Sequence, residues 1–107
     1  MTVRDEVRDF VSLGPLPNEE SATDAHLQQL EEALKKITRP VTREEAELLM
    51  TAFGPDDCFG AAWVLLHLIE TAPGGPMLSS PPPSDANEWI HRMWRRIENS
   101  RRLGEIR

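Results

Sequence analysis

Two residues in the most apolar stretch of the chain, His67 and Glu70, have the types and spacing that acid–base chemistry requires. Trp63, His67 and Glu70 stand at i, i+4 and i+7, so a helix places them on one face. A glutamate that orients a histidine would make that histidine a general base. The alternative is a buried polar pair whose hydrogen bonds fix the helix register, with the tryptophan packed beside it. We expect the structural role, because the sequence offers no nucleophile for the pair to activate.

Cys58, the only cysteine, is the second candidate for chemistry. It stands at the start of the apolar stretch, and a helix N-terminus can lower the pKa of a thiol and make it reactive. Its neighbours Asp57 and Phe59, one negative and one apolar, favour a small core residue instead. A single cysteine forms no intramolecular disulfide, and the first ten residues lack the apolar run of a secretory signal. We therefore expect a cytoplasmic location.

Metal, cofactor and nucleic-acid sites lack their usual sequence patterns. His26, His67 and His91 fall in three different predicted helices, each without a second ligand at metal-site spacing. The sequence contains neither a glycine-rich phosphate loop nor a nucleophile elbow. Its net charge of −6 argues against binding nucleic acid, because phosphates require a basic surface. We expect no catalytic residue, no metal and no cofactor, and hence a protein that is not an enzyme.

The stretch that carries these candidates is predicted to be the centre of the fold. From Cys58 to Ala72 no formal charge appears before Glu70, which is typical of a helix surrounded by protein. A helix over residues 57–72 would span about 24 Å. The apolar core of a bilayer is about 30 Å thick, so we expect no membrane partner.

Four further helices are expected to pack around this one. Apolar residues at helical spacing predict them at residues 2–13, about 21–38, 42–53 and about 84–100. A capping box of Thr42 and Glu45 starts the third of these, and Ser21 and Ser84 are the expected caps of the second and the last.

The remaining segments complete the predicted organisation. Residues 73–83 are proline-rich and predict an irregular loop, and the basic end 101–107 is expected to fray. The sequence thus predicts a single all-α domain over residues 1–107. Its expected architecture is an antiparallel bundle or a short α-hairpin stack of about five helices around the helix at 57–72.

The central helix and the last helix together resemble a known family. The pattern is Trp63-x-x-x-His67-x-x-Glu70, followed by Trp89 and by Arg96-Ile97-x-Asn99-Ser100. It is similar to a pattern in the small all-helical immunity proteins of bacterial polymorphic toxin systems, including contact-dependent inhibition systems. The resemblance covers about residues 63–100. It implies a non-enzymatic cytoplasmic antidote that binds one cognate toxin domain, with the motif residues in a structural role.

The charge distribution suggests where such a partner would bind. Residues 1–84 carry six basic and fourteen acidic groups, whereas residues 85–107 carry six basic and four acidic groups. Many such toxins attack nucleic acids through basic active sites, so a basic nuclease domain is one expected partner, which an acidic inhibitor would attract. The candidate contact residues are Glu44, Glu45, Glu47, Asp56 and Asp57, with Glu19, Glu20 and Asp24 as second choices. For each residue the alternative is a solvated helix cap.

Two other functional classes remain open from the sequence. One is a small helical adaptor or regulatory module that presents the proline-rich segment 76–83 to a host protein. The other is an enzyme that uses His67 and Glu70. Under each of these hypotheses, including the immunity protein, the chain is expected to be a monomer or a weak dimer.

Overall fold

The residues that the structure describes form helices and loops, without a β-strand. The computed structural model describes residues 3–106. Its elements are α1 (Asp5–Leu13), α2 (Asp24–Lys35), α3 (Arg43–Leu49), the 3₁₀ turn η1 (Met50–Ala52), α4 (Ala61–Ile69) and α5 (Glu88–Ile106). The all-α prediction is therefore confirmed. None of these helices combines the length and the apolarity that crossing a membrane requires.

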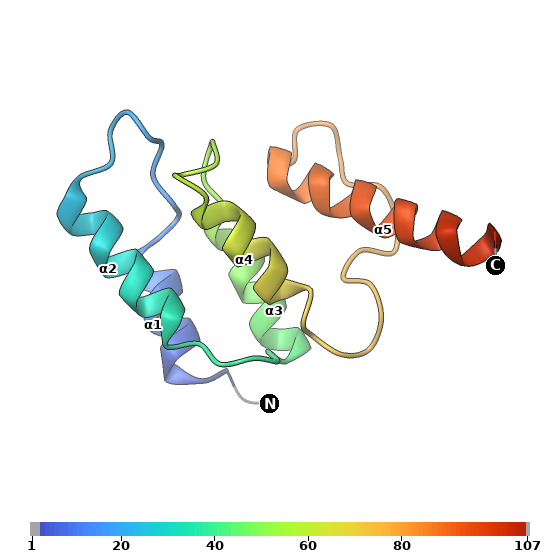
Figure 1. Cartoon of the computed structure of the whole chain (residues 1–107), viewed down its shortest axis with the longest axis horizontal. Coiled ribbons are helices and arrows are strands. Elements are labelled where there is room, and N and C mark those ends of the chain that lie inside the picture. Colours follow the sequence, from blue (N-terminus) through green and yellow to red (C-terminus); the bar gives the residue numbers. More distant parts are fainter. Residues whose placement is uncertain (1–2, 107) are drawn as a thin grey trace.

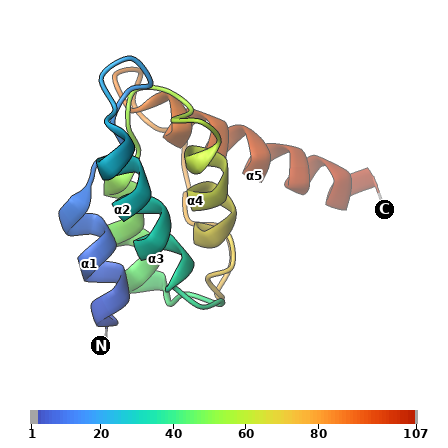
Figure 2. The same cartoon turned by 60° about the vertical axis from the view of Figure 1, so that its left-hand side comes forward.

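The first four helices form two hairpins that lie side by side. α1 packs against α2, α3 packs against α4, and α1 also contacts α3 (Figure 1). In this view α2 lies in front of α1, and α4 lies in front of α3, so α2 and α4 share one face of the molecule. α5 contacts α4 and then extends away from the other helices (Figure 2).

The core lies between the two hairpins and under the start of α5. Its apolar side chains come from every helix, because each amphipathic helix turns its apolar stripe inward. The largest fully buried apolar side chains include Phe10, Leu16, Leu49, Leu65, Leu66, Ile69 and Met93. Gly54 allows the two interhelical loops to meet, since a Cβ atom there would lie 1.9 Å from the carbonyl oxygen of Leu16.

The central helix is shorter than the predicted range 57–72. α4 begins at Ala61, because the three residues before it have left-handed backbone angles. The φ angles are 49° at Cys58, 55° at Phe59 and 91° at Gly60, which a right-handed helix excludes. Gly60 is a weak sequence sign of this turn, because glycine tolerates a positive φ, but aspartate before an apolar run is also a normal helix start.

The central helix is also less enclosed than its composition predicts. Leu65, Leu66 and Ile69 are fully buried, but Trp63 and Val64 are 37 % and 47 % exposed. A short helix in a small protein leaves part of its circumference uncovered, because there are too few neighbours to surround it. α4 is thus a core helix with one apolar face in contact with solvent.

The helix ends confirm one predicted cap and correct two. Thr42 Oγ1 accepts a hydrogen bond from Glu45 N at 3.1 Å, and Glu45 Oε1 accepts one from Thr42 N at 2.9 Å, as in a capping box. α2 is capped by Thr23 instead of Ser21. At the start of α5, Asn87 Oδ1 accepts a hydrogen bond from Trp89 N at 2.8 Å, three residues beyond Ser84. Several capping residue types stand close together at both starts, so sequence alone does not select among them.

The loop and the C-terminal region were predicted in part. Residues 73–83 contain no helix, as expected for a proline-rich segment. α5 continues to Ile106, whereas the sequence predicts fraying over 101–107. Arg107 lies outside the described residues.

Candidate functional site

The acidic residues at one end of the two hairpins come from two different loops. The loop between α1 and α2 supplies Glu19 and Glu20, the first turn of α2 supplies Asp24, and the loop before α4 supplies Asp56 and Asp57. Asp56 Oδ2 accepts a hydrogen bond from Glu19 N at 3.0 Å, which joins the two loops. We call these five residues the acidic end.

The first-choice contact residues do not form one corner. Glu44 and Glu47 are exposed, but they belong to α3, which begins at the opposite end of the hairpin from Asp56 and Asp57 (Figure 1). α3 and η1 separate the two pairs, because consecutive helical residues rise about 1.5 Å each. The second-choice residues of the α1–α2 loop are the ones that join the aspartates.

Glu45 has to be removed from the candidate surface, because its side chain is fully buried. Arg4 Nε donates to Glu45 Oε2 at 2.9 Å, and Arg4 Nη2 donates to Oε1 at 3.1 Å. The Arg4 guanidinium lowers the pKa of the Glu45 carboxyl from its ordinary 4.5 to about 2. Burial acts in the opposite direction, and the backbone N–H groups of Arg4 and Thr42 add to the lowering. This carboxylate holds the fold together and is unavailable to a partner.

Phe59, next to the acidic end, is the most exposed large apolar residue of the described part of the chain, and it is not among the residues selected from the sequence. Its side chain is 65 % exposed, although a large apolar residue is more often buried. Its backbone has a left-handed φ of 55°, which is uncommon for a residue with a Cβ atom. Phe59 N donates to Glu19 Oε2 at 2.8 Å, and Cys58 N donates to Asp56 Oδ1 at 2.9 Å. Two acidic side chains therefore hold the turn that displays Phe59.

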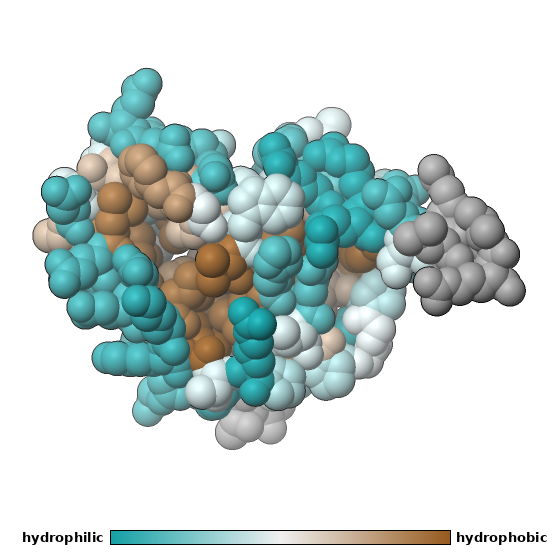
Figure 3. Space-filling model, in the orientation of Figure 1, coloured by the Kyte–Doolittle hydropathy of each residue, from teal (hydrophilic) through white to brown (hydrophobic). Residues whose placement is uncertain are grey.

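An apolar groove begins at Phe59 and runs between α2 and α4. Its volume is about 500 Å³. Figure 3 shows it as a hydrophobic hollow in the face that α2 and α4 share. Leu27, Leu30 and Leu34 line it from α2, and Ala61 and Val64 line it from α4. Glu31 is the charged residue among its lining residues.

The residues of the family-like pattern lie where α4 meets α5, and most of them make contacts there. The Trp63 and Trp89 rings meet edge to face with centroids 5.0 Å apart. The Arg92 guanidinium lies 4.7 Å from the Trp89 ring centroid, in cation–π geometry. Trp89 is buried, and its Nε1 donates to Asp56 O at 3.2 Å. Trp89 thus packs in the core, and its hydrogen bond links α5 to the acidic end.

His67 and Glu70 do not form the buried polar pair that their spacing predicts. Both residues are exposed, and the Glu70 carboxylate accepts hydrogen bonds from Arg96 Nε at 2.7 Å and Arg96 Nη2 at 3.0 Å. His67 lies beside Trp63, with ring centroids 6.0 Å apart. Asn99, the last residue of the pattern, is exposed. The partner of Glu70 is therefore an arginine on another helix, and no hydrogen bond links His67 to Glu70.

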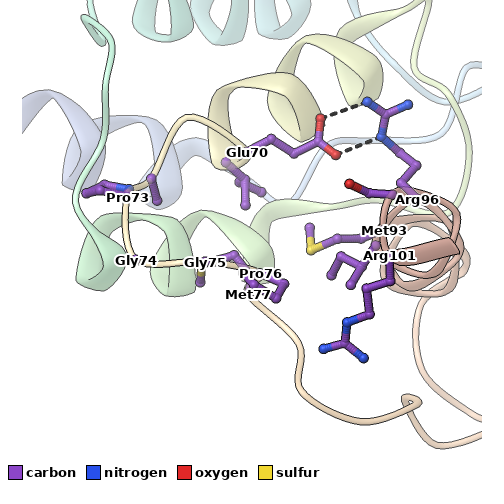
Figure 4. Close-up of a pocket in the computed structure, with 13 residues that line it drawn as sticks. Glu70, Pro73, Gly74, Gly75, Pro76, Met77, Met93, Arg96 and Arg101 are labelled. Carbon is purple, nitrogen blue, oxygen red and sulfur yellow. Dashed lines mark hydrogen bonds and ion pairs between the residues drawn. The ribbon is translucent and has the colours of Figure 1, made fainter. Parts of the chain in front are cut away.

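A second cavity of about 490 Å³ lies beside this ion pair (Figure 4). The Glu70–Arg96 pair forms part of one wall, and the segment from Pro73 to Met77 forms another. Arg43 Nη1 donates to Gly75 O at 3.1 Å, which fixes that segment to α3. Arg101 also lines this cavity, so its lining carries one more basic than acidic side chain, opposite in sign to the acidic end.

Cys58 is a buried core residue with a free thiol, as expected. Burial raises the pKa of the Cys58 thiol, and the negative charges of Asp56, Glu19 and Asp57 raise it further. A raised pKa reduces the thiolate fraction, which opposes a nucleophilic role.

Among residues 3–101, whose side chains the structure describes, no group of three or more histidine, cysteine, aspartate and glutamate side chains is arranged to hold a metal ion. Comparison of the chain with protein-family models, with curated proteins and with solved structures found no match. The resemblance to immunity proteins thus remains a prediction from residues 63–100.

Proposed function

We propose that this chain is an immunity protein, a cytoplasmic inhibitor that binds one cognate bacterial toxin domain through the acidic end. The observation that carries the proposal is the exposed Phe59 side chain, held in a left-handed turn between Glu19 and Asp56. The left-handed backbone of Phe59 supports the proposal, because residues with strained backbone angles cluster at functional sites.

An aromatic residue surrounded by carboxylates suits a basic protein surface. Large aromatic anchors supply much of the energy of protein interfaces, and surrounding polar residues exclude water from them. The carboxylates of the acidic end would attract lysine and arginine side chains and accelerate association. A nuclease domain has such a basic surface, because it binds phosphates.

The proposal is tested by co-expression in a bacterial host. The gene upstream of this chain is expected to encode a large secreted protein whose C-terminal domain is toxic when produced alone. Co-expression of this chain should restore growth, and the two proteins should co-purify. The proposal fails if this chain neither rescues growth nor co-purifies with that domain.

Two variants locate the contact. Phe59→Gly should weaken binding about 30-fold, because an interface anchor contributes about 2 kcal/mol or more. It should leave the fold intact, since glycine adopts the observed φ readily.

Glu20→Lys should also weaken binding, and Glu47→Lys is its matched control. Both residues are exposed, and both substitutions change the charge by the same amount at opposite ends of the hairpins. Equal weakening by the two variants would mean that net charge, and not the acidic end, attracts the partner.

A further inference from the structure

We propose that the groove between α2 and α4 binds one helix of the partner protein, an amphipathic helix with basic residues at the end nearest Phe59. The inference rests on the proposed function, because it names the structural element of the partner that this face would receive. It assigns a role to the apolar walls, which the acidic end alone does not explain.

The shape of the groove fits a helix. α2 and α4 run along its two sides in the same direction (Figure 1) and have 12 and 9 residues. At 1.5 Å per residue the walls are about 18 Å and 14 Å long, which matches about three turns of a guest helix. Helices bind such grooves through apolar side chains at positions i, i+3, i+4 and i+7.

The walls of the groove present apolar side chains that no other helix covers. Leu27 and Leu34 are half-buried on α2, and Val64 is exposed on α4. In Figure 3 these two helices border the hydrophobic hollow on the visible face. An apolar guest stripe would remove this surface from water, and burial of apolar area favours association.

The charged residues around the groove indicate which end of the bound helix should carry basic residues. Glu19 and Asp56 stand at the Phe59 end, whereas Glu31 on the α2 wall forms an ion pair with Lys35 at 3.1 Å. Lys35 and Lys36 are exposed at the other end of α2. A helix with lysine or arginine at the end nearest Phe59 would complement the first group, and it would avoid repulsion by the second if its other end were neutral or acidic.

A helical peptide of about 12 residues, which spans about 18 Å like the longer wall, tests this directly. Its probe form has leucine at i, i+3, i+4 and i+7 positions, lysine on the flanks of one end, and a fluorescent label. The matched peptide has glutamate in place of lysine. We expect the lysine peptide to bind the full chain at least tenfold more tightly than the glutamate peptide, as measured by fluorescence anisotropy.

Val64→Asp should weaken binding of the lysine peptide at least tenfold. His67→Asp is its control, because His67 is exposed on the same helix and does not line the groove. The control should change affinity less than about twofold. A nitroxide on the basic end of the peptide should broaden the amide signals around Phe59 and leave those around Lys36 sharp.

Three results would overturn the inference. The first is equal affinity of the Val64→Asp and His67→Asp variants for the peptide, or no binding at all. The second is broadening around Lys36 instead of Phe59. The third is a concentration-dependent dimer that Val64→Asp abolishes, which would identify a second copy of this chain as the occupant.

The co-expression experiment separates this inference from the proposed function. If wild-type chain and Val64→Asp rescue growth equally, the groove is not the contact, and the proposed function stands. The opposite result is also possible: wild-type chain fails to rescue growth, but it binds the lysine peptide and Val64→Asp weakens that binding. In that case the proposed immunity function is refuted, and the inference that the groove binds a helix is supported.

Discussion

Acidification should remove one identifiable contribution to the stability of this protein, that of the Glu45 carboxylate. The side chain is fully buried and accepts four hydrogen bonds. Arg4 N and Arg4 Nε donate to Oε2, both at 2.9 Å, and Arg4 Nη2 and Thr42 N donate to Oε1 at 3.1 and 2.9 Å. Protonation of the carboxylate weakens all of these contacts at once.

The size of the effect follows from the pKa of Glu45. The Arg4 hydrogen bonds are the largest cause of its fall from the ordinary 4.5 to about 2. At neutral pH this favours the folded state by about 3 kcal/mol. The folded-state pKa is the lower one, so the contribution is complete above about pH 4.5 and disappears as the pH falls towards 2. About 2 kcal/mol of it should be lost between pH 7 and pH 3.

Urea unfolding followed by tryptophan fluorescence measures this contribution. Glu45→Gln should lose about 3 kcal/mol at pH 7, and its deficit relative to wild type should shrink at pH 3. Glu44→Gln is the matched control, since Glu44 is the exposed neighbour on the same helix. Its unfolding free energy should stay within about 0.5 kcal/mol of wild type. A Glu45→Gln deficit that is the same at both pH values would refute the reasoning.

Three further predictions concern packing, reactivity and the α4–α5 contact. Gly54→Ala should lower the free energy of unfolding by more than about 3 kcal/mol, as measured by thermal unfolding, because the added Cβ atom would clash with the Leu16 backbone. An unchanged melting temperature would contradict this close approach. Cys58 should react with a thiol reagent at least about a hundredfold more slowly in the folded protein than in urea, since the thiol is buried and its pKa is raised; equal rates would show that the loop opens readily. Glu70→Gln should cost less than about 1 kcal/mol in urea unfolding, because its ion pair with Arg96 is partly exposed; a larger loss would mean that this pair fixes α5.

The helical class of this protein could be predicted because its signals are local. Apolar residues at helical spacing produced five helices near the expected places. The capping box of Thr42 and Glu45 was also predictable, since both partners lie within one turn. Local patterns of this kind need no knowledge of how the chain folds back on itself.

The candidate site depended on contacts that local patterns do not contain. Arg4 reaches Glu45 from 41 positions away and turns a predicted surface residue into a buried one. Arg96, 26 positions further along the chain, donates a hydrogen bond to the Glu70 carboxylate. The helical spacing had predicted His67 as the partner of that carboxylate. Helical spacing predicts which residues share one face of a helix. Which other residues contact that face depends on how the whole chain folds.

The exposed Phe59 was missed for a related reason. An aromatic residue in an apolar run is normally assigned to the core, and nothing in the run itself marks a left-handed turn. The weak signal was Gly60, because glycine tolerates positive φ and can end such a turn before a helix.

The two ends of the hairpins use their carboxylates differently, and this difference argues for a function at the acidic end. Glu45 stabilises the fold, because it closes a helix cap and an ion pair in the interior. Glu19 and Asp56 instead support a turn in which Cys58 and Phe59 each carry a left-handed cost of about 1 kcal/mol or more. A glycine at position 59 would avoid its share of that cost and would expose no apolar ring. Stability alone therefore does not account for a phenylalanine at this position, whereas the proposed contact with a partner at the mouth of the groove would account for it.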